Sequence, residues 1–434
     1  MTASRSIDRW YSTPWNRAAG VQRTDSAKIR TGNPDCRRFR SLRRGDDVKK
    51  ASSNSHTSQN AASPAVFFEE RQSGNGRIGI AVLNAPRTLN GLTLDMVDLL
   101  YPRLLQWERD TDIVAIVLAG AGDRAFCAGG DLHGLYRSML EGTGTEPQRL
   151  TYARTFFERE YRLDHAIHHL RTPVLVWGQG FVMGGGIGLM AGASHRVVLP
   201  DSRLAMPEIS IGLFPDVGGT WLLERVPLRG GRFLALTGAQ LQAEDAIFAG
   251  LADYLLPEDG WTALMSALET TDWPQDAVAR HECLHILLAG LQQPAHGHMG
   301  PFQTHIRLIH ACCAHTDLEA AWAAIAGLAE HPDAWLARAA QTMLAGAPGS
   351  ARLAWTLMQH GYGRSLGEIL RMELDAALHC CAEGDLQEGI RALLIDKDRM
   401  PRWSPATLAD ADMAWGEARI RLDWPDGHPL ADLA

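Results

Sequence analysis

Hydrophobic and polar positions along the chain follow two periods. Between residues 66 and 83, two strand-like runs flank the sequence Ser-Gly-Asn-Gly, a pattern typical of a β-hairpin. Thr93 then precedes apolar residues spaced by three or four positions as far as Trp107, which predicts an N-capped helix. Three continuous apolar runs predict buried strands, at 113–118, 174–179 and 195–199. Strands and helices that alternate in this way predict an α/β domain whose loops carry the chemistry.

The pattern changes at about residue 257. From there Ala, Leu and Trp recur at helical spacing, with few strand-like runs. The first 60 residues are rich in Ser, Asn, Thr and Arg and lack aliphatic periodicity, which is typical of disorder. We therefore expect a disordered basic and polar extension at 1–64, an α/β core at 65–256 and a mostly helical C-terminal region at 257–434.

Charge is distributed unevenly between the extension and the rest of the chain. Residues 1–60 carry thirteen Lys or Arg, five Asp and no Glu, a net charge of +8, which leaves −16 for the remainder. We therefore expect no nucleic-acid partner for the body of the protein. The extension has no apolar run long enough for a secretory signal, and its five Asp residues disfavour a transit peptide. A cytoplasmic location is the expectation, with the mitochondrial matrix as the alternative if the extension is a transit peptide.

Composition is that of an ordinary folded protein, with 46% apolar and 21% charged residues. No apolar run approaches the ~20 residues needed to cross a bilayer, so we expect no membrane partner. The seven cysteines have no CxxC spacing, which favours reduced thiols.

Two carboxylates stand out in the apolar segment AMPEISIGLFPDVGG, residues 205–219. Glu208 and Asp216 have no cation nearby in the sequence. Burial of a carboxyl group raises its pKa toward the range used in acid–base catalysis. The alternative is that each carboxylate caps a short helix or turn, because Pro207 and Pro215 precede them.

Two glycine-rich segments, CAGGD at 127–131 and MGGG at 183–186, each follow a predicted strand. Glycines in such loops expose backbone N–H groups, and two loops of this kind together can stabilise an oxyanion. Tight-turn packing is the alternative for each. The spacing of Gly186, Gly188 and Ala191 also fits a variant dinucleotide-binding motif, but about six residues separate it from its strand, which argues against that function.

From about residue 66 to about residue 405 the chain resembles the enoyl-CoA hydratase/isomerase (crotonase) superfamily. The resemblance implies a crotonase-like fold with a ββα spiral core, a small-molecule acyl-CoA substrate, no separate cofactor and no metal. The last motif below is specific to a branch that hydrolyses 3-hydroxyacyl-CoA thioesters, a step of valine degradation. The motifs are NAPRTLNGLT, AFCAGGDL, FFEREYRLDHAI, FVMGGGIGLM, AMPEISIGLFPDVGG and EGIRALLIDKDRMPRWSP.

The same resemblance implies roles for individual residues. The N–H groups of Gly130 and Gly185 would form the oxyanion hole, and Glu208 and Asp216 would be the catalytic carboxylates. Glu208 would attack the thioester or activate a water, and Asp216 would bind the substrate's 3-hydroxyl or assist proton transfer. The residues expected to line the substrate site are Glu160, Ala128, Gly129, Asp131 and Gly184. Arg87 is a candidate for a CoA phosphate, with a plain surface arginine as the alternative.

Gly188 separates hydrolysis from hydration in this comparison. Hydratases carry a catalytic glutamate at the position that matches Gly188, so hydration is disfavoured and thioester hydrolysis is the prediction. Two alternatives remain, an enoyl-CoA hydratase or isomerase and a non-catalytic relative that docks on an assembly through its basic extension. A homo-oligomer is possible in either case.

Two other clusters suggest different chemistry. Cys127 lies near His133 and suggests a nucleophilic thiol, although a buried thiol in a glycine-rich loop is more often inert. A second cluster suggests a metal site, although its spacing matches no zinc motif. Its members are His296, His298, His305, His310, Cys312, Cys313 and His315.

Overall fold

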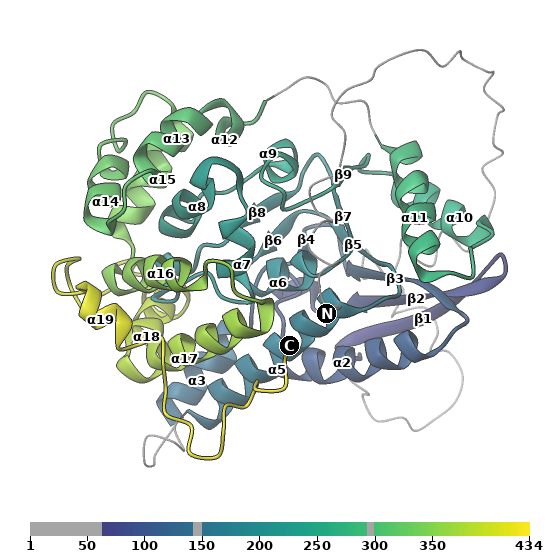
Figure 1. The fold of residues 1–434 in the computed structure, drawn as a ribbon, viewed down its shortest axis with the longest axis horizontal. Coiled ribbons are helices and arrows are strands. Elements are labelled where there is room, and N and C mark those ends of the chain that lie inside the picture. The colour runs from purple at the N-terminus through teal and green to yellow at the C-terminus, as the bar shows by residue number, and fades with distance from the viewer. Residues whose placement is uncertain (1–62, 142–149, 293–298) are drawn as a thin grey trace, which may run out of the picture.

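A six-stranded sheet forms the centre of the N-terminal half (Figure 1). The computed structural model describes residues 63–141, 150–292 and 299–434. The spatial order is β1-β2-β3-β5-β7-β9, in which β1 and β2 are antiparallel and all other neighbours are parallel. The predicted hairpin and the three predicted buried strands are confirmed. The strands are β1 (Val66–Ser73), β2 (Gly76–Leu83), β3 (Ile113–Gly120), β5 (Val174–Gly178), β7 (His195–Val198) and β9 (Tyr254–Leu255).

A second, smaller sheet was not predicted from the sequence. It has the order β4-β6-β8 and consists of three parallel strands of three residues each. Because the strands are parallel, the segments that follow them begin at the same edge of the sheet. Those segments are the CAGGD loop, the GGG segment and the chain that leads to Glu208. The strands are β4 (Ala125–Cys127), β6 (Phe181–Met183) and β8 (Arg203–Ala205).

Helices cover both faces of the large sheet. The predicted helix after Thr93 is α2 (Leu94–Arg109), and the Thr93 side chain accepts a hydrogen bond from the amide of Met96. On the same side lie α3 (Leu132–Glu141), α5 (Thr151–His169) and α6 (Gly185–Ala191). The opposite face packs against α10 (Trp261–Thr270) and α11 (Ala277–Leu291), and together they enclose a second apolar core.

Six further short helices lie between the described strands, three of them 3-10 helices and three of them α-helices of six to eight residues. Five of them follow β8, and η3 lies between β2 and α2. They are η3 (Pro86–Thr88), η4 (Glu208–Ile211), α7 (Gly219–Glu224), η5 (Pro227–Arg229), α8 (Gly230–Thr237) and α9 (Ala243–Phe248).

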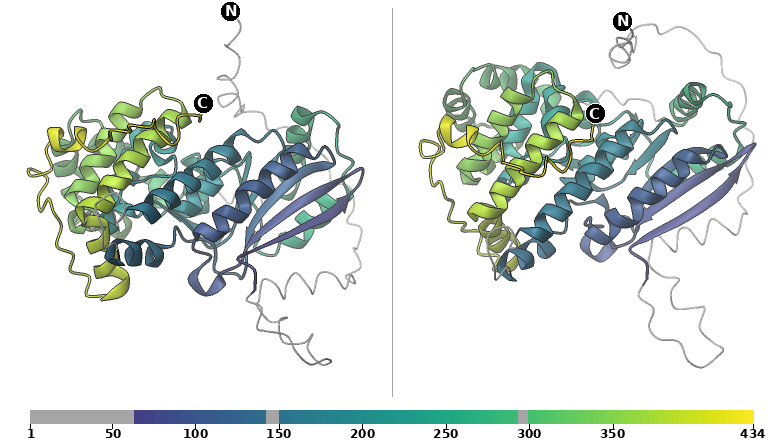
Figure 2. Two further views of the ribbon diagram at one scale, coloured as in Figure 1. Left: turned by 90° about the horizontal axis from the view of Figure 1, so that it is seen from below. Right: turned by 60° about the horizontal axis from the view of Figure 1, so that its bottom comes forward.

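In the described residues after Leu255, every regular element is a helix, as predicted. Helix α17 packs along α5, and α16 packs against α7 and α8. Figure 2 shows most of this region as green and yellow helices on the side of the molecule away from the hairpin, while α10 and α11 lie near the hairpin. No helix among the described residues is long and apolar enough to cross a membrane. The helices are α12 (Pro301–Thr304), α13 (Ile306–Cys313), α14 (Leu318–Ala326), α15 (Ala334–Ala345), α16 (Pro348–Gly361), α17 (Leu366–Glu383), α18 (Asp385–Ile390), the π-helix η6 (Arg391–Ile395) and α19 (Met413–Glu417).

The division into three parts stays a prediction. The expected extension, residues 1–64, lies outside the described residues except for Ser63 and Pro64. Helices α10 and α11 belong to the predicted C-terminal region, yet they pack on the large sheet of the core.

Candidate active site

Gly130 and Gly185 lie side by side where the oxyanion hole is predicted. A Cβ atom on Gly185 would lie 3.5 Å from the backbone nitrogen of Gly130. A bridge to Leu92 fixes the chain around Gly130, since Leu92 N donates to Gly129 O at 2.8 Å and Asp131 N donates to Leu92 O at 2.9 Å. Neither bond uses the N–H of Gly130. The geometry therefore suits two N–H donors that converge on one oxygen, a role that stays a prediction.

The start of α6 is in close contact with two of the predicted carboxylates. Gly184 has φ +48°, in the left-handed region that favours glycine, and a Cβ atom there would lie 2.8 Å from Oε1 of Glu208. A Cβ atom on Gly185 would collide with Oε1 of Glu160. The two glycines thus allow Glu208 and Glu160 to pack directly against the backbone of the predicted oxyanion hole.

Gly188 has no carboxylate of its own, yet it lies beside one in the structure. The carboxyl group of Asp164, which belongs to α5, lies over it, with Oδ2 2.8 Å from the position of a Cβ atom on Gly188. Asp164 therefore places a carboxyl group beside Gly188, although residue 188 itself has no side chain. Because Asp164 belongs to α5, the sequence around Gly188 could not predict this contact.

Five buried carboxyl groups gather around α6 and the loop before α7. Each is at most 4% exposed. For three of them, the neighbouring charges that act on the pKa are all carboxylates. The five are Glu160 and Asp164 on α5, Glu208 on η4, Asp216 in the loop before α7, and Glu373 on α17.

Burial raises the pKa of every one of these carboxyl groups. The pKa of Asp216 is raised to about 6 and that of Glu373 to about 8, in both cases chiefly by burial. For Glu160, Asp164 and Glu208 the pKa is well above its usual range, first through burial and second through the charge of Asp216. Asp216 thus ionises most readily, and its charge then disfavours ionisation of the other four.

The loop that carries Asp216 is held from two sides. The hydroxyl of Tyr161 donates to Oδ2 of Asp216 at 2.8 Å. On the other side, Glu373 accepts from the amide of Gly218 at 2.7 Å and from the amide of Thr220 at 2.9 Å. These contacts fix the position of Asp216 relative to α5 and α17.

Glu208 and Asp216 do not act as helix caps. Glu208 is the first residue of η4, but its side chain makes no capping bond. Oε2 of Glu208 is buried without a hydrogen-bond partner among the described residues. Helix α7 begins after Gly218, again without a side-chain cap. The Glu208 carboxyl group therefore keeps one oxygen available for chemistry.

The predicted CoA loop lies at the edge of the carboxyl cluster. Ala128, Gly129 and Asp131 are half-buried. Oδ1 of Asp131 accepts from the amide of Gly134 at 3.0 Å, so its carboxylate caps the start of α3. Arg87 is exposed on η3. Contact of these residues with CoA stays a prediction.

The cysteine alternative loses its chemical basis in the structure. Burial raises the pKa of Cys127 to about 12, and its thiol donates to the carbonyl of Gly129. His133 is exposed. A thiol with this pKa is protonated at neutral pH, so it is a poor nucleophile.

The His and Cys residues that suggested a metal site are dispersed. His305 pairs with Asp333, and the ring of His310 bonds to the carbonyl of Leu228. Cys312 and Cys313 are buried. His296 and His298 lie outside the described residues. Among the residues that the structure describes, no three or more His, Cys, Asp or Glu side chains are grouped to hold a metal.

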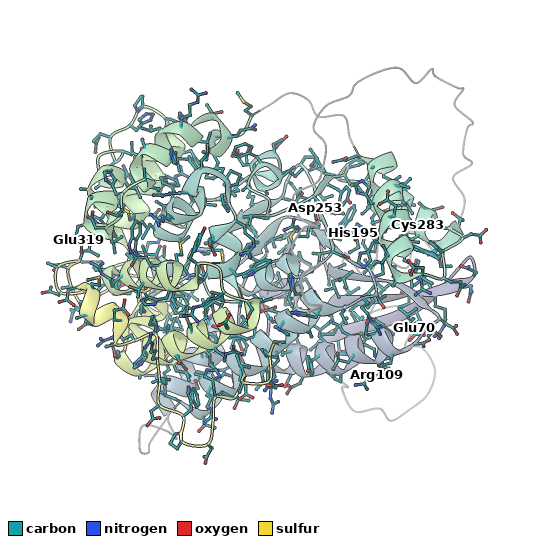
Figure 3. All side chains as sticks on the ribbon, in the orientation of Figure 1. Glu70, Arg109, His195, Asp253, Cys283 and Glu319 are labelled. Carbon is teal, nitrogen blue, oxygen red and sulfur yellow. The ribbon has the colours of Figure 1, made fainter. Side chains whose placement is uncertain are left out.

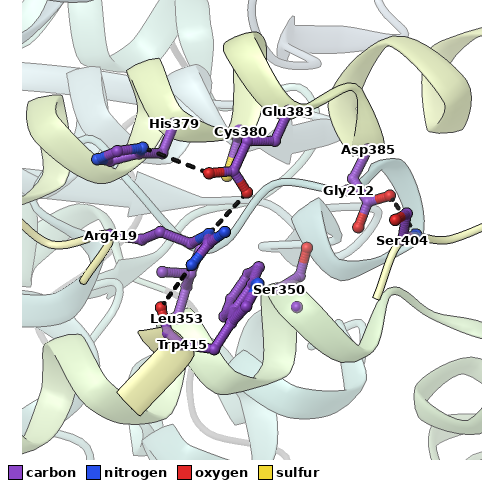
Figure 4. A pocket seen from close by; sticks show the side chains of 11 residues that line it. Gly212, Ser350, Leu353, His379, Cys380, Glu383, Asp385, Ser404, Trp415 and Arg419 are labelled. Atoms are coloured by element: carbon purple, nitrogen blue, oxygen red, sulfur yellow. Dashed lines mark hydrogen bonds and ion pairs between the residues drawn. The ribbon is translucent and has the colours of Figure 1, made fainter. Parts of the chain in front are cut away.

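Two polar clusters elsewhere contain internal ion pairs. Beside β7, Arg196 pairs with Asp253 at 2.6 Å, and burial lowers the pKa of neighbouring His195 to about 4 (Figure 3). Between α16, α17 and the C-terminal segment, a small pocket contains Glu383, which accepts from Arg419 at 2.6 Å (Figure 4). None of the five clustered carboxyl groups lines this pocket.

Two carboxyl groups of the cluster, Asp164 and Glu373, and the neighbouring Tyr161 were not predicted from the sequence. Tyr161 and Asp164 stand beside and one turn after Glu160, so helical spacing on α5 was the available signal. Glu373 lies in an ordinary helical pattern far along the chain and carries no local signal.

Comparison with known proteins identifies the family of the chain. A family model described as enoyl-CoA hydratase/isomerase matches residues 78–419. The mitochondrial 3-hydroxyisobutyryl-CoA hydrolase of Rattus norvegicus is 33% identical over 380 residues, 86% of this chain and 92% of the relative. The Homo sapiens protein of the same name is 32% identical over 351 residues, 80% and 86% of the two chains.

Solved structures give the same fold. A carnitinyl-CoA dehydratase from Mycobacterium thermoresistibile has a TM-score of 0.71 and 32% identity, covering 82% of this chain and 97% of its own. An enoyl-CoA hydratase from Rhodobacter sphaeroides has a TM-score of 0.68 and 32% identity, with 81% and 96% coverage. The chain therefore belongs to the enoyl-CoA hydratase/isomerase (crotonase) family of enzymes, as its motifs predicted.

Proposed function

We propose that the protein hydrolyses the CoA thioester of a 3-hydroxyacyl group, with 3-hydroxyisobutyryl-CoA as its substrate. The relatives with that name support the reaction and the substrate. The observation that carries the proposal is the position of Glu208, whose Oε1 lies against Gly184 while Oε2 is buried and unbonded among the described residues. This carboxyl group is adjacent to the paired amides of Gly130 and Gly185.

In the proposed reaction, the thioester carbonyl oxygen accepts from the amides of Gly130 and Gly185. Burial and the charge of Asp216 raise the pKa of Glu208, so Glu208 must first lose its proton to solvent. The carboxylate then attacks the carbonyl carbon, the carbon–sulfur bond breaks and CoA leaves as a thiolate that takes a proton from solvent. Water then cleaves the mixed anhydride and regenerates the Glu208 carboxylate. In the alternative route, Glu208 removes a proton from a water that attacks the thioester directly. Both routes consume one water and release the acid and free CoA.

Asp216 would assist proton transfer in either route. Its pKa of about 6 means that it is largely ionised at neutral pH and can accept a proton from the attacking water. The bond from Tyr161 holds it in place. Glu160 lies over Gly185, where a neutral carboxyl group can contact the bound thioester.

Hydration of an enoyl-CoA is the second candidate function. It is favoured by the carboxyl group of Asp164 over Gly188, which together with Glu208 gives two carboxyl groups near the predicted oxyanion hole. The names of the two solved relatives also fit this reaction.

One assay separates these functions. The purified protein is mixed with 3-hydroxyisobutyryl-CoA or an enoyl-CoA, and free thiol and enoyl absorbance are followed together. Thiol release from the hydroxyacyl-CoA supports the proposal. Loss of enoyl absorbance without thiol release supports hydration. No change in either signal with any substrate supports a non-catalytic relative.

A labelling experiment separates the two hydrolytic routes. A single turnover is run in oxygen-18 water, and a parallel reaction contains hydroxylamine. Label in the Glu208 carboxylate, or a hydroxamate at Glu208, identifies the anhydride. Absence of both identifies direct attack by water.

The pathway, location and assembly stay proposals. The substrate would place the enzyme in valine degradation. The relatives' names include a mitochondrial location, whereas the sequence predicted a cytoplasmic one, with the matrix as the alternative. Fluorescent fusions with and without residues 1–64 test the location, and light scattering tests the predicted oligomer.

A further inference from the structure

Asp164 has an unusual environment for a carboxyl group. It is 4% exposed, and neither Oδ1 nor Oδ2 has a hydrogen-bond partner among the described residues. Leaving a buried polar group unpaired costs about 1–3 kcal/mol, so proteins seldom do so without a functional reason. The proposed reaction, in which Glu208 and Asp216 act on the thioester, gives Asp164 no task.

The position of Asp164 relative to the predicted oxyanion hole is fixed by two helices. On α5, Glu160 and Asp164 are four residues apart and share a face. On α6, Gly185 and Gly188 are three residues apart and also share a face. Glu160 lies over Gly185, and Asp164 lies over Gly188. Gly188, over which Asp164 lies, follows Gly185 by three residues, about 4.5 Å along the axis of α6.

Burial indicates which end of the substrate is near Asp164. The large CoA group must extend toward solvent, and the predicted CoA loop at Ala128 to Asp131 is half-exposed. Asp164 and Asp216 are both only 4% exposed. The acyl group must therefore occupy the buried side, and its C3 atom lies two carbon–carbon bonds from the carbonyl carbon, within reach of the next turn of α6.

We infer that Asp164 binds the 3-hydroxyl group of the acyl chain and determines the preference for hydroxylated over unsubstituted acyl thioesters. The inference rests on the proposed acyl-CoA substrate. A hydroxyl group both donates and accepts, so it can bond to a carboxyl group in either protonation state. Asp216 already accepts from Tyr161 through Oδ2, whereas both oxygens of Asp164 are free of such bonds among the described residues. An acyl chain without the hydroxyl would leave Asp164 unpaired, which disfavours its binding.

The test compares 3-hydroxyisobutyryl-CoA with isobutyryl-CoA, which lacks only the hydroxyl group. Asp164→Leu should lower the ratio of kcat/KM values for the two substrates by about tenfold to a hundredfold, because kcat/KM falls for the hydroxylated substrate and does not fall for isobutyryl-CoA. Asp164→Asn, which still donates and accepts, should keep the ratio within about threefold. Glu158→Leu, on the same helix but outside the cluster, is the matched control. If Asp164 has only a structural role, Asp164→Leu lowers kcat/KM for both substrates by the same factor. An unchanged ratio would therefore overturn the inference.

A binding measurement keeps the inference testable if no hydrolysis occurs. Carba analogues of both substrates, in which a methylene replaces the thioester sulfur, cannot release CoA. Calorimetric titration of the wild-type protein should show tighter binding of the hydroxylated analogue, and Asp164→Leu should abolish that difference. Equal binding of both analogues by the wild type rejects the inference. Selective binding without thiol release rejects only the proposed hydrolysis.

Discussion

The hydroxyl of Tyr161 donates to Oδ2 of Asp216 across 2.8 Å, and both side chains are buried. Burial raises the pKa of Asp216, whereas this hydrogen bond lowers it, because the bond stabilises the ionised form. The resulting pKa of about 6 lies just below neutral pH. Tyr161 therefore keeps Asp216 ionised when the proposed reaction needs a proton acceptor.

Tyr161→Phe removes this bond with little change of shape. The pKa of Asp216 should rise, so the acidic limb of the kcat/KM profile, near pH 6 in the wild type, should move to higher pH. We expect kcat/KM at neutral pH to fall by about tenfold, as for a lost bond to a charged group. Tyr254→Phe, which loses a hydroxyl bonded to His285 outside the cluster, is the control. An unchanged profile for Tyr161→Phe would contradict a proton-accepting role for Asp216.

Glu208→Gln removes the proposed nucleophile or base. We expect the rate of thiol release to fall by about a hundredfold to ten-thousandfold, because an amide neither attacks the thioester nor accepts a proton from water. KM should change little, because shape is preserved. The control is Glu224→Gln on the nearby helix α7, where no such loss is expected. A Glu208→Gln protein that releases thiol at the wild-type rate, measured in the same assay, refutes the proposed function.

Stability should fall as pH rises, because the pKa of Glu373 is raised from 4.5 to about 8 in the folded protein. Between these values the unfolded chain holds fewer protons than the folded one, so the free energy of unfolding decreases as pH increases and levels off above about pH 8. The other buried carboxyl groups act in the same direction. The total effect is on the order of a few kcal/mol.

Glu373→Gln tests that stability argument. The glutamine retains an acceptor for the loop at Gly218 but cannot ionise, so the slope between pH 5 and 8 should be shallower than in the wild type. Urea unfolding at several pH values measures it. Glu368→Gln is a suitable comparison, because Glu368 lies on the same helix and its pKa is lowered, not raised. Equal slopes in wild type and Glu373→Gln would show that Glu373 does not titrate as inferred.

Local patterns were sufficient to predict the elements that bury one face each. The hairpin, the helix after Thr93 and the long strands of the large sheet carry their own periodicity over eight or more residues, or a continuous apolar run. The small sheet is not predictable from the sequence pattern, because each of its strands has only three residues, too few to show any period.

In the site, too, some residues are predictable from the local sequence and others are placed only by long-range packing. Glu208 and Asp216 were visible because polar residues are conspicuous in an apolar segment. Glu373 contacts the Asp216 loop from 155 residues away in sequence, and only the packing of α17 on α5 brings it there. The buried position of Asp164 is not predictable from the sequence, because a carboxylate on a helix is usually exposed. Its burial depends on Gly188, which lacks the side chain that would occupy the same space.

Gly185→Ala should separate the oxyanion hole from the stability of the fold. The new methyl group would collide with the Glu160 carboxylate, so either Glu160 or the amide of Gly185 must move. Misplacing one oxyanion donor costs about a hundredfold to a thousandfold in kcat. Gly290→Ala, a helix position with open space around its Cβ atom, is the control for the substitution itself.

The double variant Gly185→Ala, Glu160→Ala distinguishes the cause of that loss. Truncating Glu160 removes the atom that the methyl group strikes, so the amide of Gly185 can return to its position. We expect the double variant to be more active than the product of the two single effects predicts, with a coupling of about tenfold or more in kcat. Effects that simply multiply would show that Glu160 does not press on the backbone of Gly185. Thermal unfolding of all four proteins establishes that the comparison is made between folded molecules.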